Sequence, residues 1–262
     1  MEVVDLNGRK GLVNGIANEH SLAWWAAKHF AEAGAELAIT YLNDKAKPFV
    51  APLAESIGAP IIVPCNVSVP GQLEAVFDAI RSRWGRLDFA FHSIAWARKD
   101  DLHVRLVDCL AEGFAEAMQI SCYSFIKMAR LAEPLMTEGG SLTTLSFYGA
   151  EKVVDHYNVM GPVKAALEAS VRYLAHELGP LRIRVNALSA GAVETRAASG
   201  IEHFDELLNE TAHKAPLRRR VEACEVRRAA VMLASDYASA VTGEVVHVDA
   251  GFHIAGMISI EE

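Results

Sequence analysis

The chain has 262 residues, of which 52% are hydrophobic, and its formal net charge is −8. This negative charge argues against a nucleic-acid binder, and the basic run 218–220 indicates a solvated or subunit-facing surface instead of a phosphate track. No apolar run is long enough to span a membrane and no basic-then-apolar signal opens the chain, so we expect a cytoplasmic protein with no membrane partner.

Apolar, strand-like runs alternate with amphipathic, helix-like stretches along the chain. Several runs are nearly all apolar, which is typical of strands covered on both faces. Because helical crossovers join parallel strands, the pattern predicts an α/β fold. We expect one Rossmann-type domain, residues 1–262, on a doubly wound parallel sheet of seven strands. The expected strands are 10–15, 36–41, 60–67, 87–94, 141–147, 182–189 and 243–248, and the expected helices include 21–33, 72–84, 112–131 and 222–235.

The end of the first strand has the features of a dinucleotide site. Gly15 lets the backbone turn tightly, and Ser21 and Leu22 open a helix whose free N–H groups suit a phosphate. The full G-x-G-x-x-G fingerprint is missing, so this loop alone is a weak signal. The Ser21 hydroxyl fits two roles equally, a helix cap or a pyrophosphate contact.

The turn after the second strand, Leu42-Asn43-Asp44, faces the adenosine ribose in such folds. No arginine stands at 42 or 43 to bind a 2′-phosphate, which favours NAD(H), although Lys45 and Lys47 are close by. Asp44 suits a helix N-cap and a ribose ligand equally well. The next two strand ends would flank the adenine and the nearer ribose through Asn66, Val67, Ser93, Ile94 and Ala95.

Tyr157 and Lys164 follow the fifth strand. We expect a helix that opens at this segment and continues through Leu178, so that seven residues place both side chains on one face, with their Cα atoms ~10 Å apart. A phenol and an ammonium at that separation can hold a ligand between them. The alternative is a buried tyrosine with a lysine that reaches the surface. His156, one residue away on the same helix, would face away from the site.

A second tyrosine and lysine, Tyr148 and Lys152, have the Tyr-x3-Lys spacing of many carbonyl reductases. They follow the strand directly, before the long helix can begin, so we interpret them as loop residues. The stretch 190–216 interrupts the strand and helix alternation and contains a short helix-like segment around 203–209. Its place after the sixth strand indicates a lid over a ligand, with a surface insertion as the alternative.

Scattered cysteines, with no Cys-x-x-Cys motif and no partnered histidine, predict reduced, buried thiols and no metal site. They are Cys65, Cys109, Cys122 and Cys224.

Together these motifs resemble the NADH-dependent enoyl-acyl-carrier-protein reductases, a branch of the short-chain dehydrogenase/reductases. Tyr-x6-Lys followed by a long lid is specific to that branch, and the resemblance spans essentially the whole chain. The matching stretches are Gly15-x5-Ser21-Leu22-Ala23, Ile39-Thr40-Tyr41-x-Asn43-Asp44-Lys45, His92-Ser93-Ile94-Ala95, Ser121-x-Tyr123-Ser124-Phe125, Tyr157-x6-Lys164, Ser189-Ala190-Gly191, Thr195-x-Ala197-Ala198-Ser199-Gly200-Ile201 and Gly243-Glu244-Val245-Val246-His247-Val248-Asp249.

The resemblance implies hydride transfer from NADH to C3 of a trans-2-enoyl thioester carried by acyl-carrier protein or coenzyme A, in a homotetramer. Tyr157 would donate a hydrogen bond to the enolate oxygen, and Lys164 would hold the nicotinamide ribose. Further cofactor contacts would come from Ala190, Gly191, Val193, Thr195 and Ala197, and the acyl chain would lie against Ala97, Phe147, Met160, Phe204 and Leu207.

Two positions depart from the family pattern. Phe147 stands where the commonest bacterial members have a second tyrosine, and Ala192 replaces a proline. Phe147 and Met160 also occupy the two positions where a ketone reductase needs hydroxyls. A reductase of another enone or of an enoyl-CoA, and a non-catalytic NADH sensor, remain as alternatives.

Overall fold

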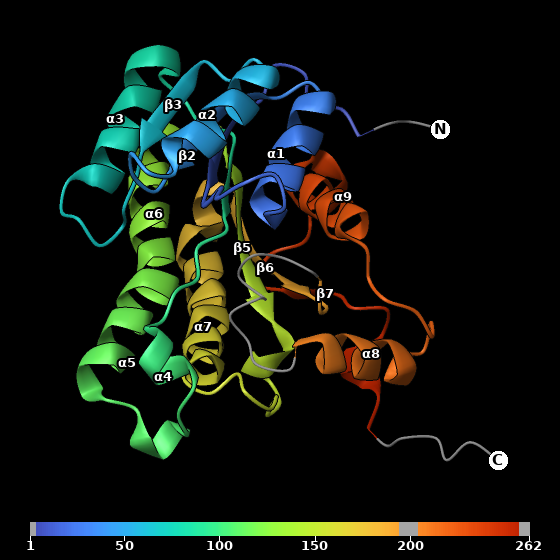
Figure 1. Cartoon of the computed structure of the whole chain (residues 1–262). Coiled ribbons are helices and arrows are strands. Elements are labelled where there is room, and N and C mark those ends of the chain that lie inside the picture. Colours follow the sequence, from blue (N-terminus) through green and yellow to red (C-terminus); the bar gives the residue numbers. More distant parts are fainter. Residues whose placement is uncertain (1–3, 194–203, 257–262) are drawn as a thin grey trace.

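The computed structural model describes residues 4–193 and 204–256 (Figure 1). Seven parallel strands form one sheet in the order β3-β2-β1-β4-β5-β6-β7. The predicted fold class is therefore confirmed. The strands are β1 (Lys10–Asn14), β2 (Glu36–Tyr41), β3 (Ile61–Pro64), β4 (Phe89–His92), β5 (Gly140–Phe147), β6 (Ile183–Ala190) and β7 (Val245–Val248).

The direction of winding reverses between β1 and β4. From β1 the chain runs outward through β2 to β3, then returns to pair β4 with the other side of β1 and continues outward to β7. From β1 and from β4 the chain crosses toward opposite edges of the sheet, and open α/β sheets bind ligands at such a point. A ligand site is therefore expected beside Asn14 and His92, the last residues of these two strands.

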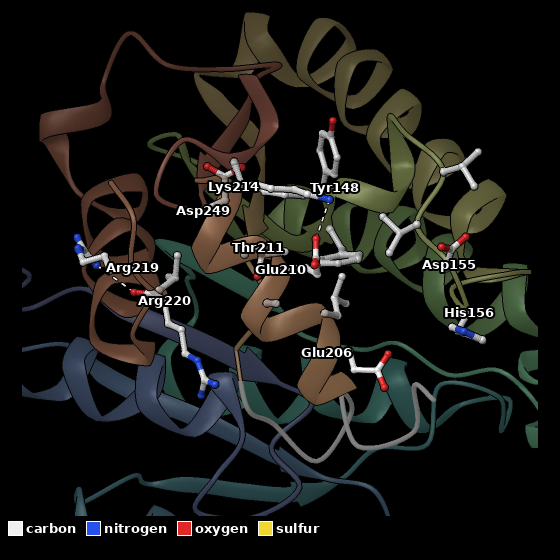
Figure 2. Close-up of a pocket in the computed structure, with 18 residues that line it drawn as sticks. Tyr148, Asp155, His156, Glu206, Glu210, Thr211, Lys214, Arg219, Arg220 and Asp249 are labelled. Carbon is white, nitrogen blue, oxygen red and sulfur yellow. Dashed lines mark hydrogen bonds and ion pairs between the residues drawn. The ribbon is translucent and has the colours of Figure 1, made fainter. Parts of the chain in front are cut away.

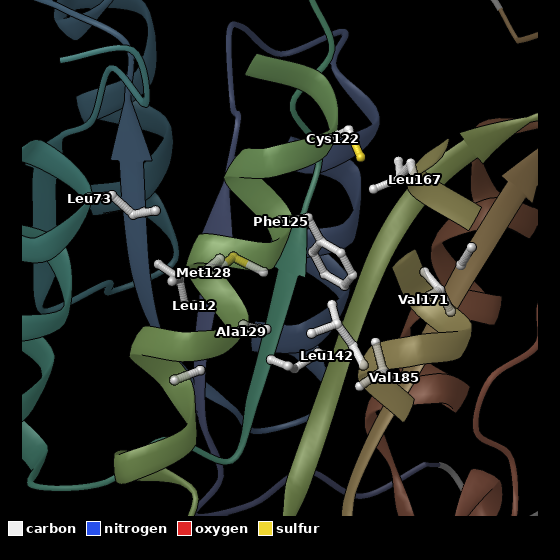
Figure 3. Packing of buried hydrophobic residues seen from close by; sticks show 14 of the residues in the cluster. Leu12, Leu73, Cys122, Phe125, Met128, Ala129, Leu142, Leu167, Val171 and Val185 are labelled. Carbon is white, nitrogen blue, oxygen red and sulfur yellow. The ribbon is translucent and has the colours of Figure 1, made fainter. Parts of the chain in front are cut away.

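Helices cover both faces of the sheet (Figure 1). One face carries α1 (Leu22–Glu32), α2 (Lys47–Ser56) and α9 (Ala223–Ala234), whose apolar side chains form one buried cluster with β1 and β2. The other carries α3 (Gln72–Trp84), α6 (Ser124–Ala132) and α7 (Met160–Leu178). In this second cluster Phe125 and Met128 of α6 pack near Leu142 of β5 (Figure 3).

Three further helices lie around the carboxyl end of the sheet. They are α4 (Lys99–Leu102), α5 (Ala111–Met118) and α8 (Phe204–Lys214). The expected helix at 203–209 is present as α8 but continues to Lys214. Within residues 4–193 and 204–256, no helix combines the length and the apolar character that crossing a membrane requires.

Several predicted boundaries need correction. The third strand was expected over 60–67 but ends at Pro64, where the ring nitrogen has no N–H for the ladder. The helix expected over 112–131 is α5 and α6 joined by one π-helical turn, Gln119–Tyr123. The α-helical and π-helical stretches follow one another without a break, so the sequence pattern did not mark the junction.

Candidate active site

Gly15 brings the loop after β1 against the loop after β4. Its φ is +105°, and a Cβ there would meet the Ser93 carbonyl oxygen at 2.2 Å. The Ser93 N–H donates to the Asn14 carbonyl at 2.9 Å, and the Ile94 side chain lies within contact of the same glycine. Only glycine fits this position, so the predicted cofactor residues Gly15, Ser93 and Ile94 do converge.

The amino end of α1 fits a phosphate group. Ser21 stands at the N-cap with extended backbone, and the first turn contains no acidic residue. The first N–H groups of a helix have no carbonyl partner within it, and the helix dipole favours an anion there. The Ser21 hydroxyl donates to the Asn18 carbonyl at 2.6 Å and caps no helix N–H, so the capping alternative is wrong.

At the end of β2, Asn43 organises the turn. Its side-chain oxygen accepts hydrogen bonds from the N–H groups of Lys45 and Ala46, at 3.0 and 3.1 Å. Because Ala46 is the N-cap of α2, the expectation that Asp44 caps the helix is wrong. Leu42 is 53% exposed and lies beside this turn.

The loops after β3 and β4 are held by side-chain hydrogen bonds. The Asn66 N–H donates to Gln72 at 2.7 Å, and the Asn66 side chain accepts from the Ser68 N–H at 3.0 Å, next to half-buried Val67. After β4, the Ser121 hydroxyl bonds both the N–H and the carbonyl of Trp96, at 2.8 and 2.9 Å. These bonds fix the backbone between exposed Ala95 and buried Ala97.

Tyr157 lies in the loop before α7, which begins at Met160. The expectation that Tyr157 and Lys164 share a helix face is therefore wrong. His156 and Asn158 have φ values of +63° and +41°, which end any helix that would include Tyr157. His156 was expected to face away from the site because it would share a helix with Tyr157. This backbone is not helical, and the His156 side chain lines the pocket described below.

The Tyr157 ring is 8% exposed and packs edge-on against Phe147, with the ring centroids 4.9 Å apart. A Cβ on Gly149 would meet the Tyr157 ring at 2.3 Å, so the turn after β5 also confines the ring. Burial raises the pKa of Tyr157 well above its ordinary value. The phenol therefore keeps its proton and is available as a hydrogen-bond donor.

Lys164 is a buried cation on α7. The side chain is 4% exposed, and Nζ donates to the Leu145 carbonyl of β5 at 2.7 Å. Burial lowers its pKa to about 8, against the opposing effect of Glu168. The alternative of a lysine that reaches the surface is therefore wrong.

Buried polar groups that the sequence analysis did not assign surround this pair. Ser146 of β5 donates a hydrogen bond to the buried Glu168 carboxyl, one helical turn beyond Lys164. His92 is 1% exposed, with Nδ1 2.9 Å from the Thr144 hydroxyl and Nε2 2.8 Å from the Ser124 hydroxyl. Desolvation lowers the pKa of His92 to about 3, so this imidazole is neutral.

The second tyrosine and lysine pair lies apart from this centre. Tyr148 begins a 3₁₀ turn, Tyr148–Ala150, and its ring packs against Phe252 with the centroids 5.3 Å apart. Lys152 is exposed. The prediction that both are loop residues, which precede the long helix in the chain, is confirmed.

A pocket of about 380 Å³ opens between the loop after β5, α8 and the segment after β7 (Figure 2). Phe147 and Leu207 line it, as expected for the acyl side. Tyr157, Ala97 and Met160 were also expected on the substrate side, but they are buried in the core cluster and are not among the lining residues. The structure thus brings together only some of the predicted substrate residues.

The chain after β6 borders the same pocket. Ala190 ends β6, the Gly191 N–H donates to the Val248 carbonyl at 2.8 Å, and Val193 is half-buried. Gly191 and Ala192 line the pocket. Thr195, Ala197 and the side chain of Phe204 lie outside the described residues.

Comparison with known proteins identifies the family. Residues 15–253 match the family model described as enoyl-(acyl carrier protein) reductase. An NADH enoyl-acyl-carrier-protein reductase of Rhizobium meliloti is 50% identical over 98% of this chain and 94% of its own length. One from Nostoc sp. is 47% identical over 97% of this chain and 100% of its own length.

The fold comparison agrees with this result. The crystal structure of the reductase from Anaplasma phagocytophilum, in complex with NAD, aligns with a TM-score of 0.94 at 50% identity, covering 99% of this chain and 100% of that one. The resemblance inferred from the motifs is confirmed, and the chain belongs to the enoyl-acyl-carrier-protein reductase family.

Proposed function

We propose that this chain reduces the double bond of a trans-2-enoyl-acyl-carrier-protein with NADH, a step of fatty acid synthesis. The observation that carries the proposal is the location of two buried side chains at the carboxyl end of β5, where the Tyr157 ring packs on Phe147 and the Lys164 Nζ donates to the Leu145 carbonyl. NADH, when bound, supplies the hydride that reaches C3 of the enoyl group. The described residues bind NADH, orient it, and control charge and proton transfer at the site.

Tyr157 stabilises the negative charge that develops on the thioester oxygen. A neutral phenol donates a hydrogen bond to that oxygen, and a donor of this kind is worth ~3 kcal/mol in a transition state. The ring is held by Phe147 and confined by Gly149, so the hydroxyl is positioned before substrate arrives. A proton from water then completes the reduction at C2.

Lys164 holds the nicotinamide ribose and contributes positive potential. Its Nζ already donates to the Leu145 carbonyl, which leaves two further N–H donors for ribose oxygens. At neutral pH the group is charged, because its pKa of about 8 lies above that range.

The rest of the cofactor would bind along the carboxyl edge. Gly15, Ser21 and Leu22 would hold the pyrophosphate, with Leu42 by the adenosine ribose. Asn66, Val67 and residues 93–95 would flank the adenine and the nearer ribose. The absence of arginine at 42 and 43 supports a preference for NADH over NADPH. Among the described residues, Ala190, Gly191 and Val193 would make the remaining cofactor contacts.

The pocket between Phe147 and Leu207 would receive the acyl chain.

We also propose that the stretch 190–216 closes over the site. Increased hydrogen-exchange protection of α8 on NADH binding would support this closure. Protection unchanged by NADH would contradict closure. As the family resemblance implies, we also propose a cytoplasmic homotetramer, and sedimentation tests the oligomeric state.

A nicotinamide absorbance assay tests the proposed activity. The purified chain should oxidise NADH when given a short trans-2-enoyl thioester, on acyl-carrier protein or on coenzyme A. A 3-ketoacyl thioester and a blank without substrate should leave the absorbance constant. Faster oxidation with the ketoacyl thioester would contradict the proposal, and the ratio of the two enoyl carriers gives the carrier preference.

A further inference from the structure

Two ionisable residues interrupt the buried apolar stripe of α7. The stripe repeats every three or four residues, which turns one side of the helix toward the sheet. Lys164 and Glu168 occupy consecutive turns of this stripe and are 4% and 5% exposed. Its other members are Met160, Val163, Leu167, Val171, Leu174, Ala175 and Leu178. Charged side chains are costly in such a setting unless they are paired.

The Glu168 carboxyl is held from the sheet. Ser146 of β5 donates its hydroxyl hydrogen to Oε1, and a donor to a carboxylate stabilises the charged form. Burial raises the pKa of Glu168, and Glu151 acts in the same direction, whereas Ser146, His247 and Lys164 lower it. The Nε2 atom of His247, on β7, is itself 2.8 Å from the Glu151 carboxyl.

The other groups around Lys164 carry no compensating negative charge. Its hydrogen-bond acceptor, the Leu145 carbonyl, is neutral. Cys122, from the π-helical turn, has a pKa raised by burial and remains a thiol. His92 of β4 is a neutral imidazole, and Tyr157 remains a phenol. Among these described neighbours, Glu168 is therefore the source of negative charge for the ammonium.

We propose that Glu168, anchored by Ser146, is a positioning residue that keeps the Lys164 ammonium charged and directed toward the cofactor edge of the sheet. This rests on the proposed role of Lys164 in holding the ribose. Without Glu168 the buried amine loses its proton more readily, and a neutral amine offers one donor fewer and no positive potential.

A purely structural role for Glu168 makes a different prediction. If the carboxyl only links α7 to β5 through Ser146, a glutamine would do the same, because its carbonyl oxygen accepts the same hydrogen bond. Glu168→Gln would then alter neither the titration of Lys164 nor the pH dependence of NADH binding. Both readouts should change if Glu168 supplies charge.

The direct test is an NMR titration of the cofactor-free protein with lysine isotope-labelled at Cε. The Lys164 signal is the one missing from Lys164→Ala. In the unaltered chain its midpoint should lie at about pH 8. In Glu168→Gln we expect a midpoint lower by about one unit, the effect of removing one nearby opposite charge. Glu177→Gln, at an exposed position of the same helix, should leave it unchanged.

Ser146→Ala provides a second variant that retains the carboxyl. Losing the hydroxyl donor favours protonated Glu168, so the Lys164 midpoint should move in the same direction as in Glu168→Gln, by a smaller amount. NADH dissociation constants are measured by fluorescence across the same pH range. As pH is raised, they should begin to increase at a lower pH in both variants than in the unaltered chain. An unchanged midpoint in Glu168→Gln would overturn the inference.

The same experiment separates this inference from the proposed function. If Lys164→Ala binds NADH as tightly as the unaltered chain at every pH, the ribose role of Lys164 fails and the inference falls with it. If Lys164→Ala weakens NADH but Glu168→Gln leaves both readouts unchanged, only the role of Glu168 is overturned.

Discussion

Two tyrosines close together in the chain after β5 differ in their surroundings. Tyr157 is 8% exposed and held between Phe147 and the Gly149 backbone, whereas Tyr148 packs against Phe252 and lines the pocket described above. Confinement fixes where a hydroxyl points, and burial strengthens its hydrogen bond to a developing charge. The same residue type is therefore catalytic at only one of these positions in our proposal.

Tyr157→Phe should lower kcat by about a hundredfold, the equivalent of ~3 kcal/mol, because the ring remains and only the donor is lost. NADH affinity should stay near that of the unaltered chain. Steady-state kinetics and a fluorescence titration measure the two effects. Tyr148→Phe is the matched control, and loss of turnover there, with Tyr157→Phe active, would show that the catalytic tyrosine has been misassigned.

His92 should make stability depend on pH. The pKa of His92 in the folded protein, about 3, is depressed from the ordinary 6.5. The contribution of the buried neutral imidazole to the free energy of unfolding is therefore complete above about pH 6.5 and is lost as pH falls toward 3. The expected slope from this group is about 1.4 kcal/mol per pH unit. Urea unfolding followed by circular dichroism, in mildly acidic buffers, gives the free energies.

In this pH range His92→Gln should show a shallower loss of stability than the unaltered chain. His176→Gln, at an exposed position of α7, is the control and should retain the full slope. Parallel pH curves for His92→Gln and the unaltered chain would mean that His92 is not the group responsible.

At the residue scale the sequence predicted Tyr157 and Lys164 because their order and spacing are visible in the chain. Glu168 was missed, although a usable signal existed: it lies four residues after Lys164 in an otherwise apolar periodic stripe. Its partner Ser146 is 22 positions away, on another element, so the hydrogen bond between them depends on how α7 packs against β5. Sequence spacing does not encode that contact.

At the scale of elements, the turn after β5 and the start of α7 act together. The 3₁₀ turn Tyr148–Ala150 packs against the loop that carries Tyr157, and Gly149 leaves the space that the ring occupies. The helix was expected to open at Tyr157, but positive φ at His156 and Asn158 delays it to Met160. His and Asn adopt positive φ more often than most residues but do not require it, so the local sequence left the start of the helix open.

Gly149→Ala should displace the Tyr157 ring, because the added Cβ would lie 2.3 Å from a ring carbon. A misplaced catalytic group costs up to about a hundredfold in rate, and we expect a loss of at least about tenfold in kcat/KM. Gly179→Ala is the control, since its Cβ would meet no heavy atom within 4 Å. Thermal unfolding shows whether both variants fold, and full activity in a folded Gly149→Ala would contradict the confinement of Tyr157.

For the molecule as a whole, apolar strand runs alternating with helices were enough to predict the sheet. Parallel strands need crossovers, and crossovers cover both faces, so Leu12 and Leu142 lie in a closed core (Figure 3). Strand order across the sheet and the exact ends of β3 and β4 required the structure. Both depend on which strands pair with one another, and the apolar pattern of the sequence does not specify that pairing.

The central claim of our proposal is that the Tyr157 phenol acts where NADH delivers hydride to C3 of the enoyl group. Reduction of a trans-2-enoyl thioester with NADH that carries deuterium at both C4 positions, followed by mass spectrometry of the product, tests this most directly. We predict a saturated thioester with deuterium at C3 and a solvent proton at C2, formed at a rate that falls with Tyr157→Phe. A product without deuterium at C3 would contradict it.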